Sequence, residues 1–456
     1  MKFQRHDVRS AFKREFGTLE LWRSRAVVIG AAALSGVTVV GFTSLAEHGF
    51  GLFSQWIVPD PWLLLLWMPA LCALIVWCTR RFAPGAAGSG IPQVMAALDP
   101  ALPATERHRF VSLRLSAFKV ALTSAGLLGG LSLGREGPSV QIAAGVMLAA
   151  RRFIPAKAPI NARGLLIAGG SAGIAAAFNT PLAGVMFAIE ELARTPEQRS
   201  SGLIVAGIVL AGLIAVSIEG NATHFGVIHP GPIGLPLLWP GVLVTVVAGL
   251  AGGLFARLLL ASLSGRPGDS ARRLRARYPV RFAATCGLGV AVVGLASHGA
   301  IFGSSNNATL ALLAGSTAPI DFAFHKFVAT WLTVWSGAPG GIFAPSLSIG
   351  AGLGSNVAAL THYPFVPALI ALGMVGFLAA ATQAPLTSFI IVMEMVDGHA
   401  MVLSLMACAV VAGTISRVLS PPLYAALAHL QLETINDQEQ RALASESATE
   451  TSPATR

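Results

Sequence analysis

Charged side chains are scarce in this sequence. Only 11% of the 456 residues are charged and 54% are hydrophobic, whereas about 25% of the residues in an average soluble domain are charged. The composition therefore excludes an ordinary soluble domain. Several uncharged stretches are long enough to cross a hydrocarbon core, which needs about 20 helical residues. These stretches are residues 26–46, 61–79, 164–189, 201–218, 230–256 and 282–320.

The longest uncharged stretch covers residues 327–393 and is too long for a single crossing of the membrane. It must hold several helices, and the turns between these helices carry no charge. We therefore expect the turns to lie in or near the membrane.

Cysteine is also scarce, and its spacing gives no metal site. Cys72, Cys78, Cys286 and Cys408 lie within or beside apolar runs, and no CxxC pair or Cys/His cluster has metal-ligand spacing. We expect these cysteines to be buried or to face lipid. We also expect no metal and no cofactor.

The excess of basic over acidic residues does not indicate a nucleic-acid partner. The net charge is +10, but the excess lies at the ends of apolar segments, in residues 1–14 and 266–281. Because lysine and arginine beside spans are typical of the cytoplasmic side, we expect residues 1–25 to be a cytoplasmic segment. These residues also lack the apolar core and cleavage site of a signal peptide. Polar residues 431–456 predict a disordered cytoplasmic tail.

Two segments of the chain resemble each other. Pro181 begins a Pro-Leu pair nine positions before Glu190, and Pro385 begins another pair nine positions before Glu394. In both copies the glutamate ends an apolar run. Transporter folds often contain such internal repeats.

A second match supports the duplication. Pro138-Ser and Pro345-Ser both end a glycine-containing turn and lie 207 positions apart, whereas the Pro-Leu prolines lie 204 positions apart. We therefore predict two transmembrane repeats, residues 26–219 and 220–430. An odd number of spans in each repeat would invert the second copy in the membrane.

These prolines favour helix starts within the membrane, because proline is tolerated in the first turn of a helix. A helix that starts at membrane depth leaves backbone N–H groups without a partner, which is costly in lipid. An anion is the natural acceptor, and the helix dipole adds to the attraction. Converging helix starts therefore predict an anion site that needs no buried positive charge.

Three short segments and one tyrosine resemble the signature segments of the CLC family of chloride channels and transporters. The order and spacing match along residues 25–430. The resemblance implies an all-α polytopic membrane protein with two internally repeated, inverted halves and broken helices around an anion pathway. The matching residues are Gly88, Ser89, Gly90, Ile91 and Pro92, then Gly134, Arg135, Glu136, Gly137 and Pro138, then Gly341, Ile342, Phe343, Ala344 and Pro345, and finally Tyr424.

The resemblance also implies an activity. We expect chloride transport in exchange for protons by a homodimer in the lipid bilayer of the inner cell membrane, with both termini cytoplasmic. Chloride and protons are the expected partners, and no enzyme activity is expected. The regulatory nucleotide-binding domains found in some CLC proteins are absent from this sequence.

By resemblance, four residues bind chloride. Ser89 and Tyr424 would donate hydroxyl hydrogen bonds, and the serine favours chloride over nitrate. Ile342 and Phe343 are apolar, so they would contribute backbone N–H groups at a helix start. From the residues alone, the Gly-Ser turn could be an ordinary loop and Tyr424 an interfacial anchor.

Glu136 lies between two glycines in an apolar context, so it should face a polar pathway. The family resemblance implies that it is the gate. Its carboxylate would occupy an anion site when ionised and swing away when protonated, which would couple the two fluxes. The alternative is an ion pair with the neighbouring Arg135.

Two adjacent glutamates have different expected roles. Glu190 matches Glu394 in the repeat and is interpreted as structural, whereas Glu191 matches Met395 and has no counterpart. By resemblance, Glu191 is the internal proton-transfer residue that exchangers carry. A solvated charge at the end of a helix is the alternative.

Lys119 and Lys326 precede the turns of the two repeats. By resemblance they could raise the local potential for anions, although a lysine near the end of a span usually extends toward the interface.

Other functions compete with proton-coupled exchange. A passive chloride channel of the same fold is the nearest alternative, and a fluoride exporter of the family is disfavoured by Ser89 and Tyr424. A membrane-embedded serine hydrolase is the distant one, because Gly169, Ser171 and Gly173 fit the GxSxG pattern. That pattern needs a strand before the serine, whereas this run of small residues suits close helix packing.

Overall fold

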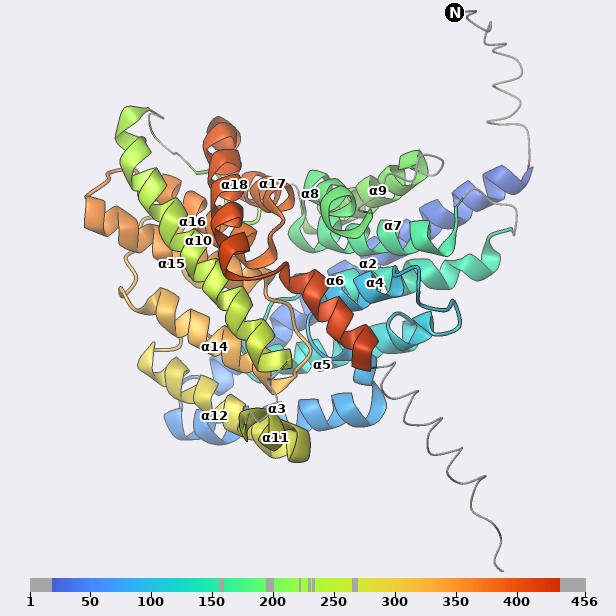
Figure 1. The fold of residues 1–456 in the computed structure, drawn as a ribbon, viewed down its shortest axis with the longest axis horizontal. Helices are drawn as coiled ribbons and strands as arrows, with labels where there is room; N and C mark the ends of the chain where they lie inside the picture. The colour runs from blue at the N-terminus through green and yellow to red at the C-terminus, as the bar shows by residue number, and fades with distance from the viewer. Residues whose placement is uncertain are drawn as a thin grey trace, which may run out of the picture.

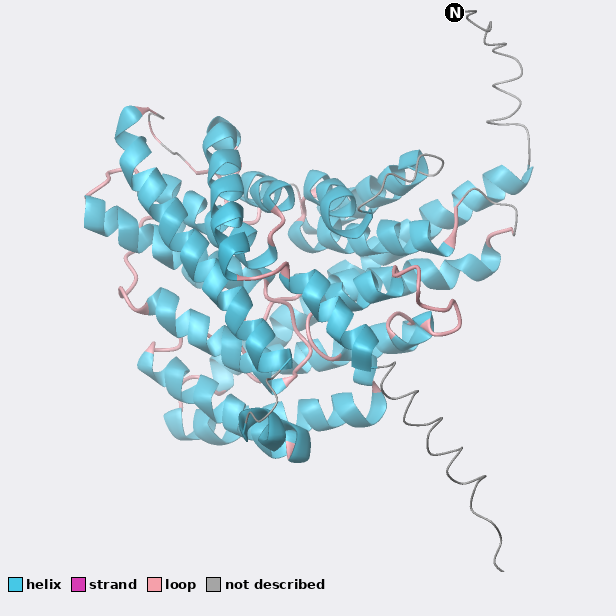
Figure 2. Ribbon diagram, viewed as in Figure 1, coloured by secondary structure: helices cyan, strands magenta, loops and turns pink. Residues whose placement is uncertain are grey.

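The chain folds almost entirely into helices in the computed structural model, which describes residues 19–155, 160–193, 201–220, 223–228, 231, 234–264 and 270–434 (Figure 1). Within these ranges loops connect the helices and no strand is formed (Figure 2). Helices suit an apolar chain, because in lipid each backbone polar group must be satisfied within its own segment.

The helices are α2 (Leu19–Trp56), α3 (Pro61–Phe82), α4 (Ile91–Ala97), α5 (Leu113–Leu128), α6 (Glu136–Ala149), α7 (Ala162–Phe178), α8 (Pro181–Phe187), α9 (Ser201–Glu219), α10 (Leu235–Ser264), α11 (Ser270–Arg277), α12 (Pro279–Ala296), α13 (Asn306–Leu313), α14 (Phe322–Ser336), α15 (Phe343–Thr361), α16 (Val366–Thr382), α17 (Pro385–Met395) and α18 (Val402–Leu419). A π-helix over Ala188–Ala193 follows α8, and residues 423–434 form a further helix.

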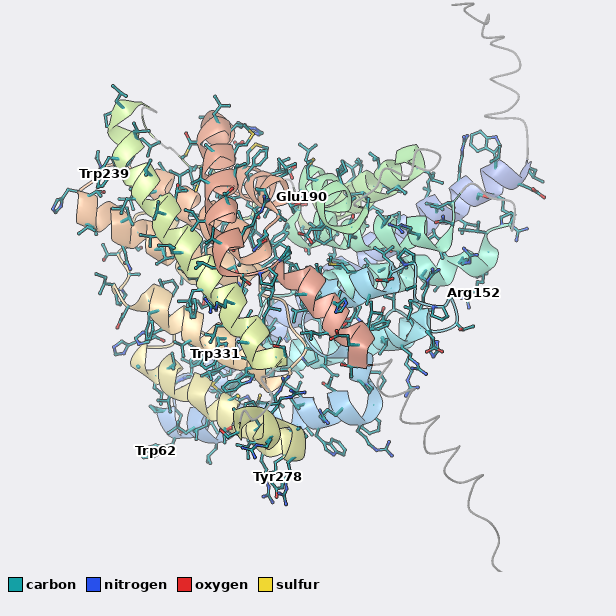
Figure 3. The ribbon with its side chains drawn as sticks, in the orientation of Figure 1. Trp62, Arg152, Glu190, Trp239, Tyr278 and Trp331 are labelled. Carbon is teal, nitrogen blue, oxygen red and sulfur yellow. The ribbon has the colours of Figure 1, made fainter. Side chains whose placement is uncertain are left out.

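Seven of the described helical segments are long and apolar enough to cross a membrane; they contain α2, α3, α5, α9, α10, α12 and α18. Large apolar side chains project outward from these helices. Trp62 and Trp239, for example, are 78% and 68% exposed and lie at the periphery of the molecule (Figure 3). Outward apolar surface of this kind suits contact with lipid.

The spans differ in detail from the uncharged stretches. Helix α2 begins at Leu19 rather than near residue 26, because Arg23 and Arg25 are accommodated in its first turns, where long basic side chains can reach the interface. The uncharged stretch 282–320, which is long enough to cross the membrane, contains most of α12 and all of α13. The break between these two helices uses left-handed conformations at His298, Gly299 and Gly303.

The long stretch 327–393 holds several helices, as predicted. It contains most of α14, all of α15 and α16, and most of α17. The uncharged turns between them use left-handed conformations at Gly337, His362 and Gln383. The predicted tail differs at its start, since helix 423–434 continues to residue 434. The rest of that tail and residues 1–18 of the predicted N-terminal segment lie outside the described residues.

The helices of the two halves correspond one to one from α5–α9 to α14–α18. Asn179 after α7 and Gln383 after α16 are both left-handed, with φ of 58° and 61°. Each donates its N–H to an alanine carbonyl four residues earlier, at Ala175 and Ala379. In Figure 1 α5 to α9 lie on the right of the view and α14 to α18 on the left, with α8 and α17 adjacent between them.

The repeat prolines begin α8 and α17, and each helix start is capped by the other half. The Glu190 carboxylate accepts the N–H groups of Leu386 and Thr387 of α17, at 3.0 and 2.7 Å. Glu394 does the same for two N–H groups of α8, at 3.3 and 2.9 Å. Glu190 lies just after α8 and Glu394 lies in the last turn of α17, and each binds the start of the other helix, so α8 and α17 run antiparallel. We call this arrangement the α8–α17 clasp, and it means that the halves are inverted.

Small residues bring neighbouring helices of each half into backbone contact. A Cβ at Gly350 of α15 would lie 2.3 Å from the Gly373 carbonyl oxygen of α16, and a Cβ at Gly373 would lie 2.2 Å from the Gly350 oxygen. In the first half a Cβ at Gly173 of α7 would lie 2.4 Å from the Ser139 oxygen of α6. This packing fixes the positions of α6 and α15, whose first residues belong to the candidate site.

Candidate functional site

The three signature segments meet at one place. Gly134 and Gly341 form an antiparallel bridge in which each N–H donates to the other residue's carbonyl at 2.8 Å. The Gly340 N–H donates to the Gly88 carbonyl at 3.0 Å. Segments that are far apart in the sequence are therefore joined by their backbones.

Three helices begin at this junction. Helix α4 starts at Ile91, α6 at Glu136 and α15 at Phe343. Pro138 and Pro345 occupy the third position of α6 and α15, two residues later than a proline at the first position would be. A proline still suits this position, because the first four N–H groups of a helix have no partner within the helix. The converging N-termini create a positive potential without a charged side chain.

Two buried hydroxyl groups lie at the junction. Ser89 Oγ would be 2.3 Å from a Cβ placed on Gly137, so it touches the first turn of α6. Tyr424 lies in the first turn of helix 423–434, is 1% exposed and lies beside Ser89. Apart from each other, neither hydroxyl has a hydrogen-bond partner in the described part of the chain. Since a buried hydroxyl normally has a partner, this pair is suited to hold a polar ligand.

Ile342 and Phe343 are both buried at the start of α15. The Phe343 ring lies between Phe178 and Tyr424, with ring-centroid distances of 6.1 and 6.0 Å. Because these two side chains are apolar, their polar contribution to the site is limited to the backbone N–H groups of the first turn.

The Glu136 side chain is buried at the start of α15. It is 2% exposed, and its carboxylate lies within hydrogen-bonding range of the Ala344 backbone N–H. A Cβ on Gly134 would be 2.4 Å from its Oε2 atom, so only glycine leaves room there. The carboxylate thus occupies a place where the α15 N-terminus attracts negative charge. The guanidinium of Arg135 is paired with Glu47 of α2.

Glu191 lies apart from the junction, on the side of Tyr424. It is buried within the π-helix that follows α8, and it interacts electrostatically with Tyr424. A π-helix adds a residue to the turn and often occurs at functional sites. Glu190 takes part in the α8–α17 clasp, as its match in the repeat predicted for a structural residue.

The two lysines correct the expectation of side chains that reach the membrane interface. Lys119 and Lys326 are completely buried. Lys119 Nζ donates to the carbonyls of Ala86 and Gly88 at 2.9 and 2.6 Å. Lys326 Nζ donates to the carbonyls of Ile301 and Gly303 at 2.9 and 2.7 Å.

These bonds give the lysines equivalent roles in the two halves. Each holds a glycine turn, and Lys119 holds the turn that carries Ser89. Sequence reasoning found the lysines but missed the carbonyls, because nothing in the sequence links Lys119 to residues about 30 positions earlier.

The GxSxG run does not have the geometry of a hydrolase. Ser171 lies in the middle of α7 and is fully buried. A Cβ on Gly169 or Gly173 would lie less than 3 Å from α6, so these glycines allow α6 and α7 to approach. The strand that the hydrolase pattern requires before the serine is replaced by helix.

The sequence profile of the family described as voltage gated chloride channel matches residues 71–417, which is most of the chain. The chain belongs to the CLC family. Its curated CLC relatives include the H(+)/Cl(-) exchange transporter ClcA of Klebsiella pneumoniae (strain 342), which is 30% identical over 446 residues covering 92% of this chain and 90% of the relative. ClcA of Salmonella typhimurium (strain LT2) is 29% identical over 457 residues, covering 93% of this chain and 91% of the relative.

Solved CLC structures agree with the fold. A slow cyanobacterial Cl-/H+ antiporter has a TM-score of 0.78 at 26% identity and covers 91% of this chain and 99% of its own. A CLC-type fluoride/proton antiporter has a TM-score of 0.71 at 21% identity, with 88% and 96% covered, and shares the fold. With its seven candidate spans, this CLC chain is a multi-pass membrane protein.

Proposed function

We propose that this CLC chain exchanges chloride for protons across the membrane, as the curated relatives and the cyanobacterial neighbour are named to do. The observation that carries the proposal is the buried Glu136 carboxylate at the N-terminus of α15. One site that attracts anions is held by a group that can also carry a proton.

Chloride binding is assigned to the junction of the signature segments. The buried hydroxyls of Ser89 and Tyr424, which have no partner other than each other, donate hydrogen bonds to chloride, and the backbone N–H groups of Ile342 and Phe343 at the start of α15 complete the site. Lys119 contributes by shaping the turn, because both of its hydrogen bonds go to backbone carbonyls. Neutral donors hold chloride weakly enough for it to leave.

Glu136 acts as the gate in this mechanism. The ionised carboxylate and chloride compete for the positive end of α15, so chloride passes when the carboxylate leaves. Protonation removes the negative charge that holds the side chain there. Chloride binds where the ionised carboxylate was, and the proton binds to the carboxylate itself. Because both events depend on the same side chain, the two fluxes are coupled and the result is exchange.

Glu191 is proposed to pass protons between the cytoplasm and the pathway. Its burial in the π-helix and its position on the Tyr424 side support this role. A buried ionisable residue inside a membrane protein is costly to keep, which favours a functional reason for its presence.

The location and assembly are also proposed. The inner cell membrane with cytoplasmic termini follows from the basic residues that flank the spans. A homodimer with one pathway per subunit is proposed from membership of the CLC family. Light scattering of the detergent-solubilised protein tests the dimer, and the mass of one chain plus detergent would contradict it.

The exchange is tested with purified protein in liposomes. A chloride gradient is imposed, the membrane potential is clamped with a potassium ionophore, and internal pH is recorded. In the wild type we expect chloride flow to drive protons uphill. Glu136→Gln and Glu191→Gln should each lower the proton flux by more than about tenfold, since a carboxamide cannot transfer a proton.

Glu20→Gln is the matched control, because it makes the same change on an exposed side chain at the start of α2. It should leave both fluxes unchanged. Chloride flow with a flat internal pH in the wild type would mean a channel. Uphill proton movement that survives Glu191→Gln would remove that residue from the proton route.

A further inference from the structure

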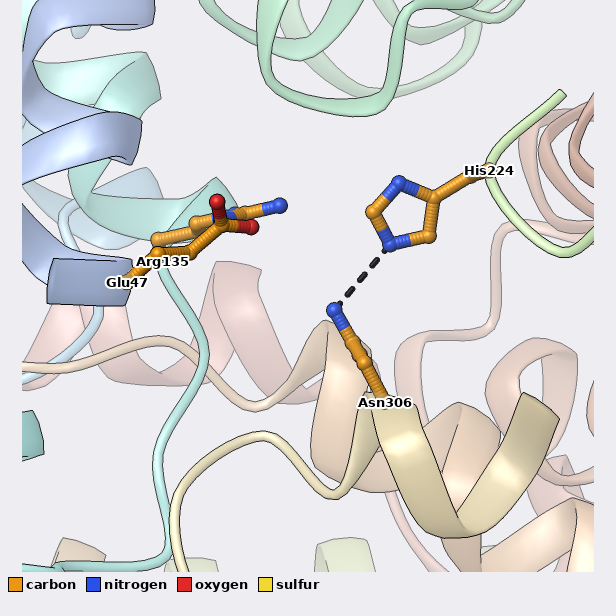
Figure 4. A network of polar contacts seen from close by, with 4 residues as sticks. All are labelled: Glu47, Arg135, His224 and Asn306. Carbon is orange, nitrogen blue, oxygen red and sulfur yellow. Dashed lines mark hydrogen bonds and ion pairs between the residues drawn. The ribbon is translucent and has the colours of Figure 1, made fainter. Parts of the chain in front are cut away.

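A group of polar side chains adjoins the gate. Arg135 directly precedes Glu136, is 6% exposed, and pairs with Glu47 of α2 across 88 sequence positions. In Figure 4 the head groups of Glu47 and Arg135 lie together and are directed toward His224. The Glu47 side chain is 62% exposed, so this ion pair joins the buried gate region to the aqueous surface.

His224 is a neutral neighbour of the ion pair. The Asn306 Nδ2 amide donates to His224 Nε2 at 3.0 Å, so this ring nitrogen carries no proton (Figure 4). Burial lowers the pKa of His224 to about 4, and the positive charge of Arg135 adds to the effect. The imidazole is therefore uncharged near neutral pH and does not alter the charge balance around Arg135.

The remaining charged groups near Arg135 are carboxylates. Glu219, at the end of α9, interacts with both Arg135 and Glu47, and His48 beside Glu47 is exposed. Charged residues of the other helices packed on α2 have different contacts. Lys119 of α5 binds the Gly88 carbonyl, Arg114 of α5 the Phe82 carbonyl, and Arg163 of α7 the Ala193 carbonyl.

Arg135 favours the ionised form of Glu136 by direct attraction. Glu47 opposes this effect through Arg135, because the ion pair holds the guanidinium toward α2. Removing the Glu47 charge leaves Arg135 uncompensated beside the gate, so the Glu136 carboxylate becomes harder to protonate.

We propose that Glu47 is a positioning residue for the gate, which acts through Arg135 and sets the pH range over which exchange operates. This inference rests on the proposed gating role of Glu136. Protonation opens the gate, so transport rises as the pH falls through the titration of Glu136. Loss of Glu47 therefore moves the midpoint of this rise to lower pH.

The experiment measures chloride efflux from liposomes containing the full chain, at a series of equal internal and external pH values. Glu47→Gln should move the midpoint of the pH profile down by about half a pH unit, a modest shift because Glu47 is largely exposed to solvent screening. Glu47→Asp keeps the charge and should restore most of the wild-type midpoint. Glu20→Gln makes the same charge change about 40 Å away along α2 and should leave the midpoint unchanged.

A double variant tests whether the effect of Glu47 on the midpoint depends on Arg135. If Glu47 acts through Arg135, adding Glu47→Gln to Arg135→Gln should give no further shift. A lower rate at every pH with an unchanged midpoint would show a structural role only and overturn the proposal. An additional shift in the Arg135→Gln background would also overturn it.

Failure of the gating role is separable from failure of this inference. Glu136→Gln should abolish the pH dependence, and a profile that persists in this variant would refute the gate itself. A flat Glu136→Gln profile together with an unmoved Glu47→Gln midpoint would refute the role of Glu47 alone.

Discussion

Glycine at position 137 shows how tightly the site is built. A Cβ there would lie 2.3 Å from Ser89 Oγ and 3.2 Å from the Gly341 Cα atom. Contacts shorter than about 3 Å require something to move, and two of the three nearest atoms, the Ser89 carbonyl oxygen and the Gly341 Cα atom, belong to the backbone. The Ser89 hydroxyl is the group that can move most easily, so an added side chain should disturb chloride binding before it disturbs the fold.

Gly137→Ala should therefore impair transport more than stability. We expect chloride flux to fall by about tenfold or more as the Ser89 hydroxyl is displaced, with an overpacking cost of about 1–3 kcal/mol in the free energy of unfolding. Chloride efflux and thermal unfolding in detergent measure the two effects. Gly30→Ala is the control, because a Cβ at Gly30 would meet nothing within 4 Å. Normal efflux by Gly137→Ala would contradict this geometry.

The α8–α17 clasp is the main device at the scale of single elements. Pro181 and Pro385 remove one N–H from the start of each helix, and the next two N–H groups would be unpaired in an apolar medium. A carboxylate from the inverted copy accepts both of them. Hydrogen bonds to a charged acceptor are stronger than neutral ones, so the clasp ties the two halves together.

Neutralising either glutamate of the clasp should weaken the contact between the halves. We expect Glu190→Gln and Glu394→Gln each to lower the free energy of unfolding by about 1–2 kcal/mol, because an amide offers a single neutral acceptor in place of the carboxylate. Denaturation of the purified protein in detergent measures the loss. Glu433→Gln, at the exposed end of helix 423–434, is the control, since the ion pair of Glu433 with His429 lies at the surface and contributes little. Wild-type stability in both clasp variants would show that the capping bonds contribute little.

At the scale of the whole molecule, the distribution of charge supports the proposed orientation. The basic helix α11 lies between α10 and α12 in the second half and contains four arginines in eight residues. The segment after α9 holds His224 beside Arg135, at the opposite end of α2 from its basic start. From the positive-inside rule we expect α11 on the cytoplasmic side and the His224 segment on the other side.

Single cysteines test this orientation. Ser270 at the start of α11 and Val227 after α9 are both exposed. A membrane-impermeant maleimide should label Ser270→Cys only in inside-out vesicles and Val227→Cys only in right-side-out vesicles. The parent chain is the control, since three of its four cysteines are buried. The reverse labelling pattern would invert the assignment of the cytoplasmic side.

Sequence and tertiary structure determined different parts of this molecule. Membrane location, the duplication and the signature segments follow from composition, spacing and proline positions, which are properties of the linear chain. The breaks between α12 and α13 and the early start of α2 were not predicted, because an absence of charge does not mark where a helix ends.

Tertiary structure alone decided which side chains meet. Three sets of contacts join residues that are far apart in the sequence. Arg135 pairs with Glu47, and Lys119 donates a hydrogen bond to the turn that carries Ser89. Glu190 and Glu394 each accept hydrogen bonds from the first turn of the other half's helix. Such contacts depend on how helices pack, and small residues such as Gly350 and Gly373 set that packing at distances that no local pattern encodes. The sequence was therefore enough to predict Glu136 as the gate, whereas the tertiary structure was needed to identify the residues that contact the gate region.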